Sequence, residues 1–245
     1  MSEETLITLS WVMIAFAAIV FAALKFRKDP AGYGRYADKQ KFGINPKWAW
    51  IIQESPSFFI PLYFWLSGTS TTGFYLNSVI LVHYFYRTFI YPLRIRSKNR
   101  NALGLVIGAF LFCAYNGYLQ GEWNAYYQEE ESLNIRHFFG AVIFLSGMYI
   151  NHSSDNILFG LRTPGKSEYK IPYGGLFEYV SCPNYLGEII EWIGYAIVAW
   201  NLPALAFAIF TAANIGPRAL SHHQWYKTKF QSYPKQRRAL IPYII

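Results

Sequence analysis

Seven apolar stretches of membrane-spanning length follow one another along this chain of 245 residues. A helix needs about 17 to 25 predominantly apolar residues to cross the hydrocarbon core of a bilayer. Charged residues make up only 15% of the sequence, whereas a typical soluble domain has about 25%. The sequence therefore predicts an all-α, polytopic membrane protein with seven transmembrane helices, near residues 6–24, 48–66, 74–93, 102–118, 136–158, 174–196 and 204–220.

The basic residues are sorted between the connections. All but two of the 22 lysines and arginines lie in the first, third and fifth connections or in and beside the C-terminal tail, and the exceptions are Arg87 and Arg136. Because basic residues are retained on the cytosolic side, this pattern predicts a cytosolic C-terminus and an extracytosolic N-terminus. The topology also explains the net charge of +8, so no nucleic-acid partner is expected. The fourth connection is expected to be acidic, with Glu122, Glu129, Glu130 and Glu131.

The sixth stretch, 174–196, is apolar enough to cross a membrane yet contains Asn184, Glu188 and Glu191. In a helix, Asn184, Glu188 and Trp192 lie on one face because they are spaced four residues apart. An ionisable side chain at membrane depth costs roughly 2.5–3.5 kcal/mol on insertion scales and faces a partner or a cavity. We therefore expect a polar group against this face, while Glu191, one step off it, has no assigned role.

Another carboxylate occurs in the second stretch, where Gln53 and Glu54 precede Pro56. A proline inside a helix frees a backbone carbonyl one turn earlier, so Pro56 predicts a bend near the carboxylate. Two interpretations of Glu54 stay open. It is either solvated in the membrane interface, or held in an apolar pocket as a neutral acid that donates a hydrogen bond.

The third stretch contains a polar run at residues 83–88, which includes Tyr84 and Arg87. A tyrosine at membrane level commonly belongs to the interfacial aromatic belt, and this is the plain interpretation of Tyr84. Arg87 lies inside the apolar stretch and needs a carboxylate or carbonyl oxygens as partners. Glu54 is one candidate partner.

Polar residues at helical spacing also occur where the fifth and seventh stretches reach the cytosol. Asn151 and Asp155 are four residues apart, as are Arg218, His222 and Tyr226. A cationic helix end with histidine and tyrosine suits a phosphate or an anionic cofactor, and the alternative is a positive-inside border with one snorkelling arginine. No metal site is predicted, since neither an HExxH motif nor a cysteine partner accompanies His222. The chain also has no glycine-rich phosphate loop, so a nucleotide would need a site built from helices and connections.

Several motifs closely resemble the steroid 5α-reductase (3-oxo-5α-steroid 4-dehydrogenase) family, and they span nearly the whole chain. The most specific are IPYGGLFEYVS at 171–181, NYLGEIIEWIGYA at 184–196, and the tail with YPK at 233–235 and ALIP at 239–242. The first half is similar to the family at Gln53-Glu54 and at His83-Tyr84-Phe85 with Arg87-Thr88. The combination of these two motifs points to the steroid branch.

The resemblance implies an integral membrane enzyme that uses NADPH to reduce the C4–C5 double bond of a 3-oxo-Δ4 steroid. Glu54 and Tyr84 match the family's pair that stabilises negative charge on the C3 oxygen while hydride is added to C5, an oxyanion-hole effect. An apolar pocket favours the neutral carboxylic acid that Glu54 needs in order to donate. Trp50 and Gln53 are implied to line the steroid cavity.

The resemblance also implies which residues surround NADPH. Arg162 and Arg218 fit the phosphates as bidentate donors, and Asp155 fits a ribose or amide group. Arg35 is a further candidate phosphate contact, with a plain surface charge as the alternative. The implied cofactor-binding residues are Asn151, Asp155, Arg162, Tyr169, Asn184, Glu188, Arg218, His222 and Tyr226.

We expect a single membrane-embedded domain over residues 1–245, with the substrate side mainly in 1–120 and the NADPH side mainly in 145–245. The steroid is expected to enter from the lipid phase of a bacterial inner membrane or of the endoplasmic reticulum, among membrane lipids and with no obligate protein partner. The alternatives are a related membrane reductase of a polyprenol, an enoyl thioester or a sterol double bond, an isoprenylcysteine-type methyltransferase, and a non-catalytic lipid-binding protein. The buried acids argue against the last.

Overall fold

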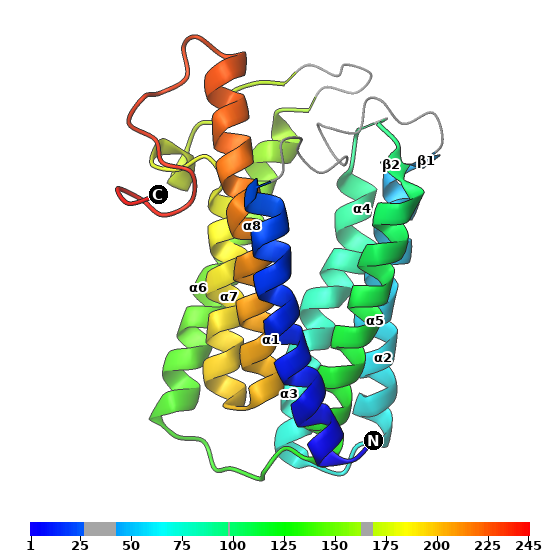
Figure 1. Ribbon diagram of the computed structural model, residues 1–245. Helices are drawn as coiled ribbons and strands as arrows, with labels where there is room; N and C mark the ends of the chain where they lie inside the picture. The colour runs from blue at the N-terminus through cyan, green and yellow to red at the C-terminus, as the bar shows by residue number, and fades with distance from the viewer. Residues whose placement is uncertain (27–42, 98, 163–168) are drawn as a thin grey trace. The chain divides into compact units, whose positions relative to one another are not determined.

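The computed structural model describes residues 1–26, 43–97, 99–162 and 169–245 (Figure 1). Most of them are helical, which confirms the helical part of the predicted fold class. The chain divides into two compact units. The first unit comprises Met1–Ser10 and Ala31–Ser132, and the second comprises Trp11–Pro30 and Leu133–Ile245. Helix α1 (Glu3–Phe26) contributes residues to both.

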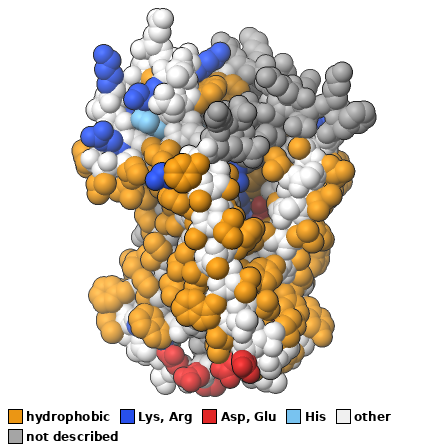
Figure 2. Space-filling view, in the orientation of Figure 1, with side chains coloured by type: hydrophobic (Ala, Val, Ile, Leu, Met, Phe, Trp, Pro, Cys, Tyr) orange, Lys and Arg blue, Asp and Glu red, His pale blue; other side chains and the backbone are white. Residues whose placement is uncertain are grey.

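A helix occupies each of the seven apolar stretches. Among the described residues, two helices are long and apolar enough to cross a membrane, Glu3–Phe26 and Leu103–Tyr126. Large apolar side chains, such as Trp11, Phe59 and Tyr149, are exposed on the helices, and orange atoms cover much of the surface in Figure 2. Apolar exposure on this scale is typical of a membrane-facing surface. The number of spans and their orientation stay predictions.

The first unit is built from helices that follow one another with short connections. Its elements are α2 (Pro46–Ser67), α3 (Thr71–Phe85), the π-helical turn Tyr86–Ile90, α4 (Tyr91–Arg94) and α5 (Leu103–Tyr126). Ser70 begins α3 as its N-cap, because its hydroxyl accepts from the N–H of Gly73. A short antiparallel ribbon, β1 (Gly43–Ile44) with β2 (Asn101–Ala102), precedes α2 and α5 and was not predicted.

The acidic connection predicted to include Glu122 begins later than expected. Helix α5 continues to Tyr126, so Glu122 lies inside it, is 5% exposed and pairs with the N-terminal amine of Met1. This pairing offsets part of the cost of burying the carboxylate. Glu130 lies beyond the helix and accepts hydrogen bonds from backbone N–H groups at the start of α3, which lower the pKa of Glu130.

The second unit brings three long helices side by side (Figure 1). Its elements, besides the later part of α1, are α6 (Ile135–Gly160), the short 3₁₀ helix η3 (Gly175–Glu178), α7 (Pro183–Ala199) and α8 (Leu202–Lys229). Asn134 caps α6 and Asn201 caps α8 through their side-chain oxygens.

The sixth stretch is not one helix from residue 174, which corrects the prediction. Gly174 and Gly175 have φ values of 94° and 53° and turn the chain into η3. Helix α7 begins only at Pro183, which suits the first helical position because an N–H there has no helical partner. The face formed by Asn184 and Glu188 is kept on α7, whereas residues 174–182 form a separate segment.

Helices α6 and α7 pack with their backbones in close contact. A Cβ atom on Gly147 would lie 2.2 Å from the backbone nitrogen of Glu191, and one on Gly187 would lie 2.4 Å from the backbone nitrogen of Asn151. Only glycine fits at such distances. Glu191, to which the sequence assigned no role, is fully buried beside this contact. The same contact brings Asn151 of α6 against the first turns of α7.

Candidate functional site

The candidate carbonyl-binding residues lie on two helices of the first unit. Trp50, Gln53 and Glu54 are on α2, and Tyr84 is near the end of α3. Tyr84 is buried, whereas the other three are half-buried. The Gln53 amide donates to Glu54 Oε1 at 3.4 Å. The carboxyl group thus lies in a partly enclosed, largely aromatic part of the unit, and is not fully solvated.

Contacts of α2 with the end of α3 and with the π-turn that follows it fix the position of Glu54 along its helix. Trp50 Nε1 donates to the backbone carbonyl of Arg87 at 3.0 Å, and the rings of Phe58 and Phe85 lie 6.1 Å apart. Trp50 and Phe58 are each one turn from Glu54 on α2. Their partners, Arg87 and Phe85, lie within three residues after the candidate tyrosine. Glu54 is therefore bracketed by contacts to the part of the chain that carries this tyrosine.

A π-helical turn begins two residues after Tyr84, and sequence reasoning missed it. The N–H of Tyr91 bonds to the carbonyl of Tyr86, five residues earlier. The next residue, Pro92, has no N–H, so the carbonyl of Arg87 has neither an i+4 nor an i+5 donor and accepts from the Trp50 indole instead. π-Turns inside α-helices occur frequently at functional sites. Pro92 within the third stretch was the available signal.

The candidate cofactor residues of α6 and α7 form a hydrogen-bonded group in the second unit. Asn151 Nδ2 donates to the carbonyl of Asn184 at 2.9 Å, and Asn184 Nδ2 donates to Asp155 Oδ1 at 3.2 Å. Glu188 lies one turn further along α7 and is half-buried. The structure thus brings these four predicted residues to one end of the α6–α7 pair.

The predicted residues on α8 follow one another along one face of a continuous helix. Arg218 Nε donates to the carbonyl of Asn214 at 3.0 Å, and His222 Nε2 lies 3.2 Å from Tyr185 Oη of α7. Tyr226 is buried one turn later. The Tyr185–His222 bond links this face to the first turn of α7, which also carries Asn184.

Arg162 and Tyr169 are the described residues on either side of residues 163–168. The Arg162 guanidinium carbon lies 4.1 Å from the centre of the Tyr169 ring, a cation–π contact. The same ring lies 5.1 Å from Trp225 of α8. Arg35, the further phosphate candidate, lies outside the described residues.

A hydrogen-bonded cluster that was not predicted holds the C-terminal tail. Ser181 Oγ lies 2.6 Å from both His223 Nδ1 and Tyr233 Oη, and Tyr233 stacks on Tyr226 with ring centres 5.2 Å apart. Burial, assisted by the charges of nearby basic residues, lowers the pKa of His223. Burial raises the pKa of Tyr233. The tail is therefore packed against the face of α8 that carries the candidate cofactor residues.

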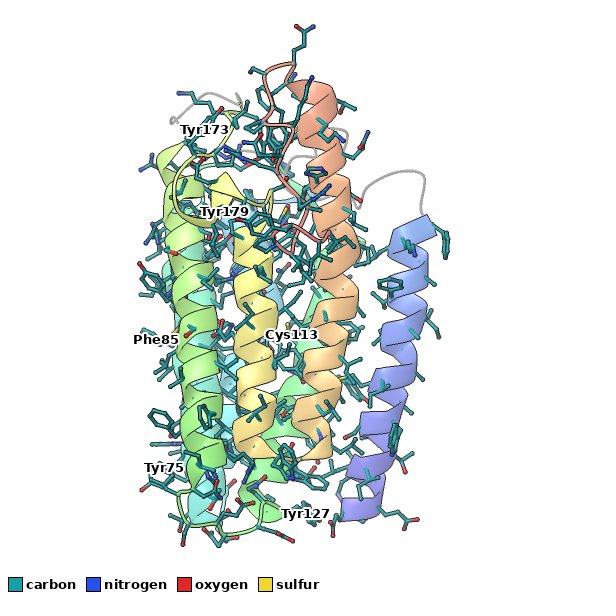
Figure 3. All side chains as sticks on the ribbon, turned by 90° about the vertical axis from the view of Figure 1, so that its left-hand side faces the viewer. Tyr75, Phe85, Cys113, Tyr127, Tyr173 and Tyr179 are labelled. Atoms are coloured by element: carbon teal, nitrogen blue, oxygen red, sulfur yellow. The ribbon has the colours of Figure 1, made fainter. Side chains whose placement is uncertain are left out.

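Arg237, one of the basic residues of the tail, is 1% exposed. It donates to the carbonyl of Pro172 at 2.9 Å, and its guanidinium lies 4.8 Å and 5.4 Å from the ring centres of Tyr173 and Tyr233. Tyr173 and Tyr179 mark the segment that precedes α7 in Figure 3. Arg237 thus joins the tail to this segment.

The donors and acceptors of this group fit a dinucleotide. Two arginines supply the planar donors that phosphates bind, and asparagine and aspartate suit ribose and amide groups. Asn151 Oδ1 is buried and has no hydrogen-bond partner in the described part of the chain. A buried acceptor without a donor is costly, so a ligand N–H or O–H at this atom would relieve the cost.

Comparison with known proteins identifies the family. The sequence model described as 3-oxo-5-alpha-steroid 4-dehydrogenase matches residues 99–245. The chain belongs to this family. It is thus an oxidoreductase of a family of steroid metabolism. The match covers the candidate cofactor residues from Asn151 to Tyr226, whereas Arg35, Trp50, Gln53, Glu54 and Tyr84 precede it.

Full-length relatives cover the first half as well. The 3-oxo-5-alpha-steroid 4-dehydrogenase 2 of Sus scrofa is 45% identical, over 93% of this chain and 93% of the relative. The steroid 5-alpha-reductase DET2 of Solanum lycopersicum is 41% identical, over 99% of this chain and 98% of the relative. The 3-oxo-5-alpha-steroid 4-dehydrogenase 1 of Bos taurus is 39% identical, over 97% and 96% respectively. The resemblance predicted from the motifs is confirmed.

Proposed function

We propose that this enzyme reduces the C4–C5 double bond of 3-oxo-Δ4 steroids to the 5α product with NADPH. The names of the full-length relatives support the substrate class. One observation carries the proposal. The contacts of Trp50 and Phe58, one turn before and after Glu54, hold this part of α2 against the part of the chain that carries Tyr84. Two hydrogen-bond donors on facing helices can bind one carbonyl oxygen.

The pair acts on the C3 oxygen of the steroid. As the C4–C5 bond is reduced at C5, negative charge moves to this oxygen and an enolate forms. The Tyr84 hydroxyl and the protonated Glu54 carboxyl donate to the oxygen, and donors fixed in advance stabilise such a charge most effectively in a dry site. A proton is then added at C4, which restores the ketone and completes the reduction.

The second unit is proposed to hold NADPH, which supplies the hydride when bound. Arg162 and Arg218 neutralise phosphate groups, and Asn151 Oδ1 accepts from a ligand donor. Asp155 and Asn184, already hydrogen-bonded to each other, present their remaining polar atoms to ribose or amide groups. His222, Tyr226, Tyr169 and Glu188 complete the proposed cofactor contacts.

The membrane arrangement proposed with this function has seven spans, an extracytosolic N-terminus and a cytosolic C-terminus. The exposed apolar side chains and the distribution of basic residues support it. Membrane lipids then surround the protein, and the steroid enters from the lipid phase. A soluble NADPH reaches its site from the cytosol, where Arg162, just beyond the end of α6, and the basic end of α8 would lie.

The test is turnover by the protein purified in detergent. It is incubated with NADPH and testosterone or progesterone, and both NADPH absorbance and the steroid product are followed. The expected product is the 5α-dihydro steroid, and Glu54→Gln should lose turnover while still binding NADPH. If polyprenol, enoyl thioester or sterol substrates are reduced and no 3-oxo-Δ4 steroid is, the proposal is wrong. Full activity of Glu54→Gln would instead overturn the assignment of this donor.

A further inference from the structure

Arg87 is the one arginine or lysine in the third stretch, residues 74–93, and its guanidinium lies against two aromatic rings. The guanidinium carbon lies 4.8 Å from the centre of the Trp50 ring and 4.8 Å from the centre of the Tyr91 ring. These two rings are themselves 4.7 Å apart. Cation–π contacts favour arginine and strengthen when the charge is removed from water.

Both ends of Arg87 are tied to the same tryptophan. Its carbonyl accepts from Trp50 Nε1, because the π-turn and Pro92 leave this carbonyl without a helical donor. Its guanidinium contacts the ring of Trp50 from the side-chain end. A two-point contact fixes α2 against the end of α3 more tightly than either contact alone.

This contact lies one helical turn from each proposed donor. Trp50 precedes Glu54 by one turn on α2, and Arg87 follows Tyr84 by one turn. The positive charge of Arg87 is therefore held against Trp50, within about one helical turn of the level of both proposed donors.

We propose that Arg87 is a positioning residue for the reduction, which sets Glu54 against Tyr84 through Trp50 and holds a fixed positive charge beside the C3 oxygen. The inference rests on the proposed function of Glu54 and Tyr84. The charge is complementary to the enolate and not to the neutral ketone, so it acts more strongly on the transition state than on the substrate. Among the described residues of α2, α3 and the π-turn, Arg87 is the one arginine or lysine within a turn of either proposed donor.

The charge is tested by comparing two steroids of similar shape. One carries a carboxylate at C3, which stands in for the enolate oxygen, and the other carries a neutral carboxamide there. Binding of both is measured to the purified wild type, Arg87→Met and Arg87→Lys, together with kcat and KM for a 3-oxo-Δ4 steroid. Arg136→Met is the matched control, because Arg136 donates to the carbonyls of Ile197 and Val198 and covers Trp200 in the other unit.

Arg87→Met should weaken carboxylate binding about tenfold and carboxamide binding less than about twofold, the size expected for one charge acting over several ångströms in an effective dielectric of about 20. The value of kcat should fall about tenfold with little change in KM. Arg87→Lys should restore most of the carboxylate preference but not the full rate, since lysine lacks the planar group that stacks on the rings. The control should keep both the preference and the rate.

Equal weakening of the two steroids by Arg87→Met would overturn the inference, since packing alone would then explain the effect. Loss of the carboxylate preference in Arg87→Lys, which keeps the charge, would overturn the inference as well. This second test stands even if the methionine variant does not fold. The binding measurements need no turnover. A wild type that reduces no 3-oxo-Δ4 steroid would contradict the proposed function, whereas the carboxylate preference of Arg87→Met would still decide whether the charge of Arg87 acts at C3.

Discussion

The two groups of candidate residues are built in different ways. In the group proposed to bind the steroid carbonyl, the two proposed donors Glu54 and Tyr84 lie among aromatic rings, and Trp50 links Arg87 to their helices. On the cofactor side, amide, carboxylate and hydroxyl groups bond to one another across α6, α7, α8 and the tail. Chemistry is thus assigned to a few side chains, whereas cofactor binding is distributed over many. Substitutions in the first group should lower kcat, and those in the second should raise the KM for NADPH.

The largest effect is expected from Tyr84→Phe, which removes one proposed donor and keeps the ring. The value of kcat should fall about 100- to 1000-fold, as on removal of an oxyanion donor, while the Kd of NADPH is unchanged. Steady-state kinetics and NADPH titration measure the two. Tyr75→Phe, on the exposed face of the same helix, is the control and should leave both unchanged. A Tyr84→Phe enzyme with weaker NADPH binding and normal kcat would contradict the assignment of Tyr84 to the chemical step.

Arg218→Ala should have a smaller effect, and it should change the KM for NADPH instead of kcat. Loss of a charged hydrogen-bond donor to phosphate is worth about 1.5–3 kcal/mol, so the KM for NADPH should rise roughly 10- to 100-fold with kcat nearly unchanged. Lys229→Ala, an exposed basic residue at the end of α8, is the matched control. A fall in kcat without a change in the KM for NADPH would contradict this role and assign Arg218 to the chemical step.

Gly187→Ala tests whether close helix packing supports the cofactor side. The added Cβ would lie 2.4 Å from the backbone of Asn151 and force α6 and α7 apart. We expect a loss of about 1–3 kcal/mol in stability and a several-fold higher KM for NADPH, measured by thermal melting and kinetics. Gly108→Ala on α5, where a Cβ meets nothing within 4 Å, should be neutral or slightly stabilising. Equal behaviour of the two variants would contradict the packing argument.

The smallest expected effect is a pH dependence at the tail. Because the pKa of His223 is lowered in the folded protein, the unfolded chain takes up this proton at higher pH than the folded chain. The stability that neutral His223 contributes is present above about pH 6.5 and is lost as the pH falls below it. The Tm difference between about pH 7.5 and about pH 5.5 should therefore be smaller in His223→Gln than in the wild type. An unchanged difference would exclude His223 as its source.

The sequence predicted most of the helices because apolar runs of this length leave few alternatives. It also placed Asn184, Glu188 and Trp192 on one helix, and Arg218, His222 and Tyr226 on another, since helical spacing is a local property. The predicted start of the sixth helix was wrong because residues 176–182 are as apolar as the helix that follows them. Hydropathy does not register the left-handed glycines that turn the chain there.

The features that were missed depend on contacts between distant residues. Ser181 and Tyr233 are far apart in the sequence, as are Glu122 and the N-terminal amine, and no local pattern pairs them. Arg237 looked like one of several tail cations until the structure placed it between two tyrosines. The π-turn had a local cause in Pro92, but its consequence for Trp50 needs the neighbouring helix. The assigned roles of the site residues, and the division into substrate and NADPH sides, stay predictions.

The most direct test of the central claim follows the hydride itself. NADPH deuterated at either face of the nicotinamide C4 is incubated with the purified protein and a 3-oxo-Δ4 steroid in ordinary water. The account predicts that one of the two labelled forms delivers deuterium to C5 of a 5α product, while the hydrogen gained at C4 comes from water. Deuterium at C3, which would indicate ketone reduction, or a product without label from either form would contradict it.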